Sequence, residues 1–263
     1  MQTDTTTITS SDTSNESACA CGSGGCGCHS GSPHSSGTGY NLPDRFQLLQ
    51  EGDKVVEFGS GLGNDAISVA SIVGPEGKVI GIDINDTNIS KSRQKARISG
   101  IENIEFIQGD ITAAPVPDEW ADIVYTSCVF NLQSDKQKAA DEMYRVIRHN
   151  GYVCVSDFVI LRDIPDGLRK EAAELVGCIA GVEKAPVFMD YFKKTGFTKG
   201  QIVEVNKVKL PDELLSKYLD AAEMESYNNL DSDDGVFSVV LVVEKPETCS
   251  AETCCHNADK HKH

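Results

Sequence analysis

One segment, residues 54–66, constrains the fold of this chain more than any other. It reads KVVEFGSGLGNDA, in which an apolar stretch runs into three glycines at alternate positions, Gly59, Gly61 and Gly63. Apolar residues then recur with helical spacing to residue 73. A strand, a glycine turn and a helix in this order favour a ligand-binding loop, because glycine lets the main chain approach a ligand closely and the helix N-terminus offers N–H groups to an anion. The alternative is a tight turn that binds nothing.

Strand-like and helix-like patterns alternate along the rest of the chain. The expected strands are 54–58, 78–83, 104–108, 121–127, 152–157, 201–205 and 236–243. The expected helices are 63–73, 87–99 (capped by Asn85 or Asp86), 134–148, 166–182, 186–195 and 211–225. Such alternation predicts an α/β fold with a mostly parallel seven-stranded sheet and helices on both faces.

Composition narrows the choice of partner and compartment. The net charge of −16 argues against nucleic acid and anionic membranes, since both favour a basic surface. No apolar run is long enough to span a membrane, and the first residues do not combine a basic start with an apolar core. We therefore expect a cytoplasmic protein with no nucleic-acid or membrane partner.

The spacing inside the glycine loop indicates which ligand it takes. A dinucleotide loop has the pattern Gly-x-Gly-x-x-Gly, whereas here the third glycine comes one residue early and Glu57 stands two residues before the first. This E-x-G-x-G-x-G loop closely resembles that of class I S-adenosylmethionine methyltransferases, which have a Rossmann-like fold. The resemblance implies S-adenosylmethionine as cofactor, bound by Glu57, Gly59, Ser60, Gly61 and Gly63.

Two further acids follow predicted strands. Asp83 ends the second strand, 20 residues after Gly63, where a carboxylate reaches ribose hydroxyls in a doubly wound sheet. Asp110 follows the third strand, where the family resemblance implies a contact with the adenine amino group. Their neighbours Ile84 and Ile111 belong to the same predicted cofactor site. The alternatives are a helix cap or solvated acid for Asp83 and a turn aspartate for Asp110.

Ten cysteines are the unusual feature of the composition. Three are internal, Cys128, Cys154 and Cys178, and the others lie near the ends: Cys19, Cys21, Cys26, Cys28, Cys249, Cys254 and Cys255. In a cytoplasmic chain this set favours soft-metal or metalloid binding, or redox chemistry, over a disulfide scaffold. We expect a disordered tail over 1–38, a methyltransferase domain over 39–245 with a substrate insertion at about 158–185, and a second tail over 246–263.

Histidines are missing from the predicted site. Five lie in the tails, and His149 precedes the fifth strand. Most oxygen and nitrogen acceptors must lose a proton on methylation, which calls for a general base. Either a carboxylate acts as that base, or the acceptor carries a free lone pair.

Four ordered runs sharpen the resemblance: SCVFNLQSDK, EMYRVIRHNGYVCVSDF, IPDGLRKEAAELVGCIAGV and DYFKKTGF. Over roughly residues 40–245 the chain is similar to the arsenite methyltransferase branch of the class I fold. The resemblance implies arsenite as substrate, methylation as a detoxification reaction, and a thiol reductant or thioredoxin-like partner that restores oxidised cysteines. It also implies that Cys178 and Cys128 ligate arsenic. Trivalent arsenic prefers thiolates and has a lone pair that attacks a methyl group without a base.

Two departures from the family lead to a further hypothesis. Arsenite methyltransferases commonly have another arsenic-binding cysteine downstream of the one at Cys178, and the run KYLDAAEMESY in that region has none. They also usually carry a cysteine shortly before the glycine loop, and the run TGYNLPDRF has none. Two core cysteines fall short of a three-thiolate site, so we expect tail cysteines to complete it, with Cys19, Cys21, Cys26, Cys28, Cys254 and Cys255 as candidates. Alternatively, the tail clusters bind zinc or copper without a catalytic role.

Other readings stay open from sequence alone. We expect Cys154 to be a buried core residue. Cys128 is either a ligand or packing beneath the cofactor, and Asn131 either contacts a ligand or caps the next helix. At the level of function, the alternatives are methylation of a small organic carbon or sulfur acceptor, and sequestration of a metal or metalloid.

Overall fold

The computed structural model describes residues 48–247. Its elements in chain order are β1 (Lys54–Phe58), α2 (Asn64–Val73), β2 (Lys78–Asp83), α3 (Asp86–Ile98), β3 (Ile104–Gln108), β4 (Ala121–Ser127), η2 (Phe130–Leu132), α4 (Lys136–Val146), β5 (Ile147–Ile160), α5 (Asp166–Leu175), η3 (Gly177–Gly181), β6 (Glu183–Lys184), α6 (Ala185–Thr195), β7 (Thr198–Lys207), α7 (Asp212–Leu215), α8 (Ala221–Asn228) and β8 (Val236–Glu244). The predicted boundary at residue 39 and both predicted tails, apart from residues 246 and 247, lie outside the described residues.

The sheet has the order β3-β2-β1-β4-β5-β8-β7, and the short β6 pairs with β5 off this path. The pairs from β3 to β5 are parallel, whereas β8 is antiparallel to both β5 and β7. The seven predicted strands and the mostly parallel, Rossmann-like α/β fold are therefore confirmed. Only the two-residue β6 was not predicted.

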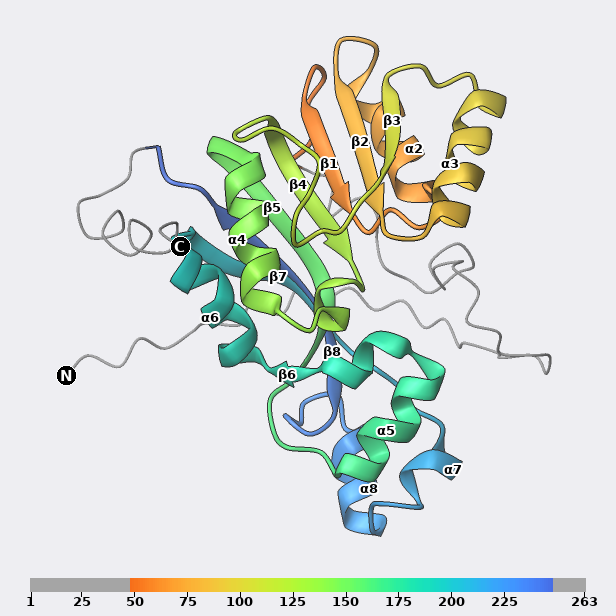
Figure 1. Cartoon of the computed structure of the whole chain (residues 1–263). Helices are drawn as coiled ribbons and strands as arrows, with labels where there is room; N and C mark the ends of the chain where they lie inside the picture. Colours follow the sequence, from red (N-terminus) through yellow and green to blue (C-terminus); the bar gives the residue numbers. More distant parts are fainter. Residues whose placement is uncertain (1–47, 248–263) are drawn as a thin grey trace.

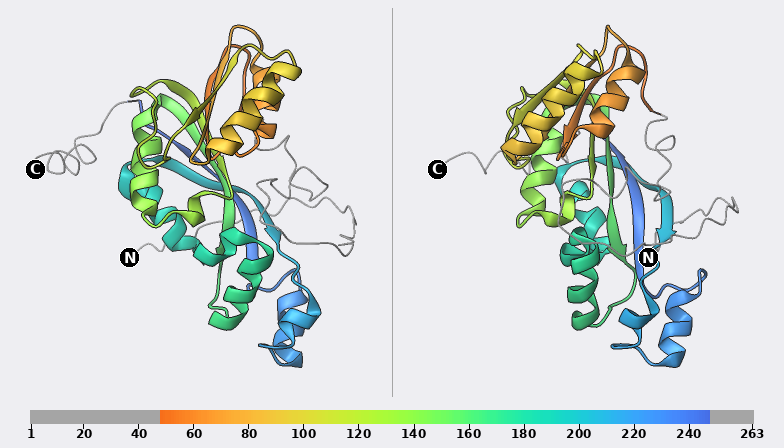
Figure 2. Two further views of the ribbon diagram at one scale, coloured as in Figure 1. Left: turned by 45° about the vertical axis from the view of Figure 1, so that its right-hand side comes forward. Right: turned by 90° about the vertical axis from the view of Figure 1, so that its right-hand side faces the viewer.

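Helices cover both faces of the sheet, as the alternation predicted (Figures 1 and 2). Buried side chains of α2 and α3 pack with one face, and those of α4 and α6 pack with the other. The parallel strands carry continuous apolar runs because both of their faces are covered. Val55 and Val56, which point to opposite faces of β1, are both fully buried.

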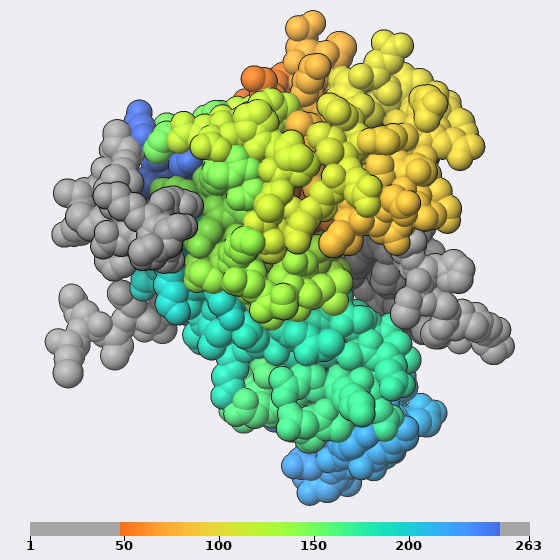
Figure 3. Space-filling view, viewed as in Figure 1, coloured from red at the N-terminus to blue at the C-terminus, as the bar shows by residue number. Residues whose placement is uncertain are grey.

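A third apolar cluster forms a lobe beyond the carboxyl end of β5. It joins α5, η3, α7 and α8 to the end of β5 and the start of β8. In Figure 3 the teal residues of this lobe lie directly below the green residues of the sheet domain, and its blue residues lie below the teal ones. The lobe contains the predicted substrate insertion.

Several predicted boundaries were wrong. The helix expected to reach Arg148 ends at Val146, because Ile147 already pairs with Ala121 as β5 begins. The fifth strand, expected to start at residue 152, already starts at Ile147, and it contains an irregularity where the register shifts between Ala121 and Ile123 and Asn150 has a φ of +59°.

The predicted single helices at 166–182 and 211–225 are each divided in two. Val176 has extended dihedral angles and separates α5 from η3. Asp220 forms a capping box with Glu223 that starts α8 as a separate helix.

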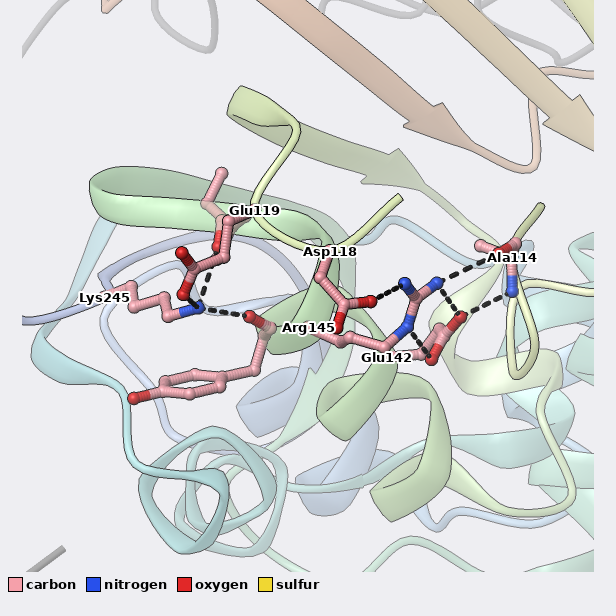
Figure 4. A network of polar contacts seen from close by, with 8 residues as sticks. Ala114, Asp118, Glu119, Glu142, Arg145 and Lys245 are labelled. Atoms are coloured by element: carbon pink, nitrogen blue, oxygen red, sulfur yellow. Dashed lines mark hydrogen bonds and ion pairs between the residues drawn. The ribbon is translucent and has the colours of Figure 1, made fainter. Parts of the chain in front are cut away.

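A polar network fastens the end of β8 to the connection before β4 (Figure 4). The ammonium group of Lys245, a residue only 4% exposed, donates to Glu119 and to the main-chain oxygens of Tyr144 and Ile147. Three acceptors satisfy this otherwise costly buried cation. The network lies at the amino ends of the parallel strands, the opposite end of the sheet from the lobe, so we assign it a structural role.

Within residues 48–247, no helix combines the length and the apolar character needed to cross a membrane.

Candidate functional site

The glycine loop joins β1 to α2 at the carboxyl end of the parallel strands. Gly59, Gly61 and Gly63 all have positive φ, at 82°, 50° and 73°. A Cβ at Gly59 would lie 2.4 Å from Cγ2 of Val129, and one at Gly63 would lie 2.5 Å from the ring of Phe106. A Cβ at Gly61 would meet nothing within 4 Å. The outer glycines therefore serve close packing, whereas the middle one faces open space.

The carboxylate of Asp83 is hydrogen-bonded to this loop. One oxygen accepts from the N–H of Gly61 at 2.8 Å, and the other accepts from the N–H of Asn85 at 2.9 Å and from the side chain of Asn88 at 3.2 Å. Asn85, one of the two predicted caps, accepts the first N–H bonds of α3. The structure thus brings Asp83 and the glycine loop together at the site where open α/β sheets bind ligands.

Internal hydrogen bonds occupy most of the loop amides. The N–H groups of Gly59 and Ser60 donate to the main-chain oxygen of Ile82. An anion would therefore accept hydrogen bonds from the N–H groups in the first turn of α2, because these groups have no partner within the helix. Glu57 is 3% exposed, and the buried Ser60 hydroxyl has no hydrogen-bond partner within residues 48–247.

The remaining predicted cofactor residues follow β2 and β3. The side chain of Asp110 is exposed, and its oxygen accepts two hydrogen bonds from Thr112, which lower the pKa of the carboxyl group. Ile111 is buried, whereas Ile84 is 71% exposed. The main-chain oxygen of Asp83 accepts from Gly109 at 3.0 Å, so these residues occupy neighbouring strand ends.

The structure also brings Cys128 and Cys178, which are 50 residues apart in sequence, side by side. Their sulfurs and a carboxylate oxygen of Asp157 all lie within 4.8 Å of one another. Within residues 48–247 this is the only such group of three cysteine, histidine or acidic ligands. Neither cysteine forms a disulfide, and Cys178 is buried while Cys128 is partly exposed.

Cys128 has an unusual main-chain conformation. Its φ is +56°, in the left-handed region that residues with a Cβ seldom adopt. Its N–H donates to the main-chain oxygen of Ser156 at 2.8 Å, which ties the end of β4 to β5. Strain of this kind is often found at functional sites.

Cys178 is placed by the packing of η3 against η2. Gly181 of η3 lies against the main-chain oxygen of Asn131 in η2. Asn131 in turn holds η2 to β5, since its N–H donates to Asp157 at 2.9 Å and its side-chain amide donates to the main-chain oxygen of Phe158 at 2.8 Å. Asn131 does not cap the next helix, because Asp135 accepts the N–H bond at the start of α4.

Asp157 was missed by the sequence analysis. It is 2% exposed, and burial raises the pKa of its carboxyl group to about 7, against the lowering effect of two backbone hydrogen bonds. One signal could have identified it: Asp157 is the single charged residue in the apolar run VCVSDFVI. A buried acid in a strand that ends near a ligand site is a candidate functional group.

Cys154 lies in the apolar cluster beneath α2 and α3 and is 2% exposed, which confirms the expected core position. The tail cysteines proposed to complete the site, Cys19, Cys21, Cys26, Cys28, Cys254 and Cys255, lie outside the described residues.

Comparison with known proteins identifies the domain. A family model described as a methyltransferase domain matches residues 49–204. The chain belongs to this methyltransferase family.

Among curated relatives, the methyltransferase is 37% identical over 166 residues to an arsenite methyltransferase of Halobacterium salinarum. This match covers 63% of this chain and 42% of the relative. It is also 34% identical over 128 residues to a ubiquinone/menaquinone biosynthesis C-methyltransferase of Vibrio vulnificus. That match covers 47% of this chain and 49% of the relative. The chain therefore spans about half the length of the curated relatives it matches.

A solved methyltransferase structure is also similar to this methyltransferase. The crystal structure of an arsenic(III) S-adenosylmethionine methyltransferase from Chlamydomonas reinhardtii is 27% identical and superposes with a TM-score of 0.61. The match covers 74% of this chain and 64% of that one.

Proposed function

We propose that this chain transfers a methyl group from S-adenosylmethionine to trivalent arsenic held by Cys128 and Cys178. The observation that carries the proposal is the pair of sulfurs within 4.8 Å of each other. The names of the arsenite methyltransferases to which the chain is similar support the same substrate.

The residues of the glycine loop fit S-adenosylmethionine. The open space at Gly61 leaves room for a ligand, and the Asp83 carboxylate beside it is an acceptor for ribose hydroxyls. Glu57 would pair with the ammonium group of the cofactor, and Asp110 with its adenine amino group. When bound, the cofactor supplies an electrophilic methyl group on a sulfonium.

The two cysteines suit arsenic as the acceptor. Trivalent arsenic is soft and binds thiolates, and two thiolates from different segments fix its position relative to the methyl donor. The lone pair on arsenic makes a general base unnecessary. This agrees with the position of His149, the one histidine within residues 48–247, whose ring contacts Glu119 and Pro246 near the end of β8.

After methyl transfer, thiols are needed to return arsenic to the trivalent state. Methyl transfer uses the lone pair and raises the oxidation state of arsenic, and a pair of thiols restores it while forming a disulfide. We propose that small thiols or a thioredoxin-like protein then reduce this disulfide in the cytoplasm. Participation of the tail cysteines stays a prediction.

The test is an arsenic-speciation assay on the purified full chain. Arsenite, S-adenosylmethionine and reduced glutathione are supplied, and methylated arsenicals are measured by mass spectrometry. We expect methylated product from the wild-type chain and from Cys154→Ala, but none from Cys178→Ala or Cys128→Ala. If Cys178→Ala kept full activity, the assignment of the arsenic site would be wrong.

One alternative function is favoured by a specific observation, the similarity to a C-methyltransferase. Weak arsenite binding, together with methylation of a small organic carbon or sulfur acceptor, would favour it. Tight arsenite binding with no methylated product would instead indicate sequestration.

A further inference from the structure

The number of thiols at the site determines what else remains on arsenic. When two thiols capture arsenite, As(OH)₃, two As–S bonds form and two As–O bonds break. The two thiol protons leave with the two hydroxides as water, and one hydroxyl group remains on arsenic. When the same thiols capture the monomethylated acid, CH₃As(OH)₂, both hydroxyls leave and none remains.

Asp157 lies beside the two sulfurs that would hold the arsenic. Its carboxylate is within 4.8 Å of both sulfurs and therefore borders any atom that bridges them. The residue is 2% exposed, so water does not compete freely for the position.

The orientation of the carboxylate is fixed by the main chain. Oδ2 accepts from the N–H of Asn131 and Oδ1 accepts from the N–H of Phe158, both at 2.9 Å. The two carboxylate oxygens have four acceptor positions, and the side-chain amide of Asn131 acts on the group as well, so at least one position stays available for a further hydrogen bond. Lys136, the basic group whose charge acts on Asp157, has its ammonium nitrogen 3.9 Å from a carboxylate oxygen of Glu183.

We propose that Asp157 binds the hydroxyl group left on arsenic when Cys128 and Cys178 hold arsenite, and so makes the site prefer arsenite over its monomethylated product. The inference rests on the proposed arsenic site and adds a substrate-binding residue to it. A hydrogen bond to a carboxylate inside a dry site is stronger than one in water, so the preference is expected to be large.

This proposal and the tail-cysteine hypothesis predict different results. A third thiolate from a tail would displace the remaining hydroxyl, and Asp157 would then have nothing on arsenic to bind. Removing the carboxylate therefore tests which group occupies the third position.

The experiment compares the binding of arsenite and methylarsonous acid to the full chain, reduced beforehand and freed of small thiols, by equilibrium dialysis with arsenic detection. The variants are Asp157→Asn and Asp157→Ala, because the amide of Asn places an NH₂ donor against one of the two backbone N–H groups. Asp141→Asn on α4, whose carboxylate accepts from Gln137 and Thr195, is the matched control.

We expect both Asp157 variants to weaken arsenite binding at least tenfold and methylarsonous acid binding less than twofold. Asp141→Asn should change neither. Because methylarsonous acid needs the same two sulfurs, its retained binding also shows that the variant is folded at the site.

If the Asp157 variants bound arsenite and methylarsonous acid more weakly by the same factor, the proposal would be overturned, since Asp157 would then only support the fold. Unchanged arsenite binding would also overturn it and would favour a thiol in the third position. A separate wild-type methylation assay reports on the proposed function: bound arsenite without product would contradict methyl transfer, while the ratio of the two affinities would still decide the role of Asp157.

Discussion

A Cβ at Gly181 would lie 1.9 Å from the main-chain oxygen of Asn131. Side chains do not tolerate such a contact, so only glycine lets η3 pack this closely against η2. This contact determines the separation of the two cysteines, because Cys178 belongs to η3 and Cys128 precedes η2.

The first prediction uses this contact. Gly181→Ala should move η3 away from η2 and weaken arsenite binding at least tenfold, since the two sulfurs would no longer reach one arsenic atom. Gly177→Ala, four residues earlier in the same element, is the matched control because its Cβ would meet nothing within 4 Å. Arsenite affinity by equilibrium dialysis checks both, and equal affinities for the two variants would contradict the prediction.

The second prediction concerns the strained main chain of Cys128. Both Cys128→Ala and Cys128→Gly should abolish arsenite methylation, because both remove the thiol. At a φ of +56°, however, glycine avoids the steric cost of a Cβ, which is about 1 kcal/mol. Cys128→Gly should therefore have a free energy of unfolding about 1 kcal/mol higher than Cys128→Ala. Urea denaturation measures the difference, and a less stable glycine variant would show that the strain is absent.

The third prediction separates the glycines of the loop. Gly61→Ala should fold with a stability loss of about 1 kcal/mol, from its positive φ alone, yet lose S-adenosylmethionine binding at least tenfold as its methyl group enters the ligand space. Gly63→Ala should be less stable still, because its Cβ would lie 2.5 Å from Phe106 and 2.8 Å from Ser92.

Thermal unfolding and calorimetric titration with S-adenosylmethionine check this contrast. If Gly61→Ala bound S-adenosylmethionine as tightly as the wild-type chain does, the open space at Gly61 would not be part of the cofactor site.

The fourth prediction concerns pH. Burial raises the pKa of Asp157 to about 7 in the folded chain, from 3.8 when exposed. Between pH 4 and pH 7 the folded chain keeps a proton that the unfolded chain has released, so stability falls as pH rises through this range. Below pH 4 both states are protonated, and above pH 7 both are ionised.

Arsenic-free wild-type protein should therefore lose more stability between pH 5 and pH 8 than arsenic-free Asp157→Asn does. Urea midpoints at the two pH values give the comparison. Parallel losses in the two proteins would show that Asp157 is not held protonated by burial.

Local sequence signals predicted the elements well where a residue acts on its immediate neighbours. Asn85 was one of two candidates for the cap of α3, and its side chain accepts from the N–H groups two and three residues ahead. The same signals failed at Ile147, whose helical pattern was overridden by pairing with Ala121 in a neighbouring strand. They also missed the break at Val176, where extended dihedral angles separate α5 from η3.

The sequence by itself determined the order of the main strands and helices and the position of the glycine loop, because these depend on main-chain freedom and on apolar spacing within a few residues. The cofactor residues named around that loop stay a prediction. It also singled out Cys178 and Cys128, but it left Cys128 between ligation and packing. Only the tertiary structure placed the two sulfurs and the Asp157 carboxylate together, at positions 128, 157 and 178. That arrangement arises from close packing between segments far apart in the chain, which no pattern within a single segment encodes.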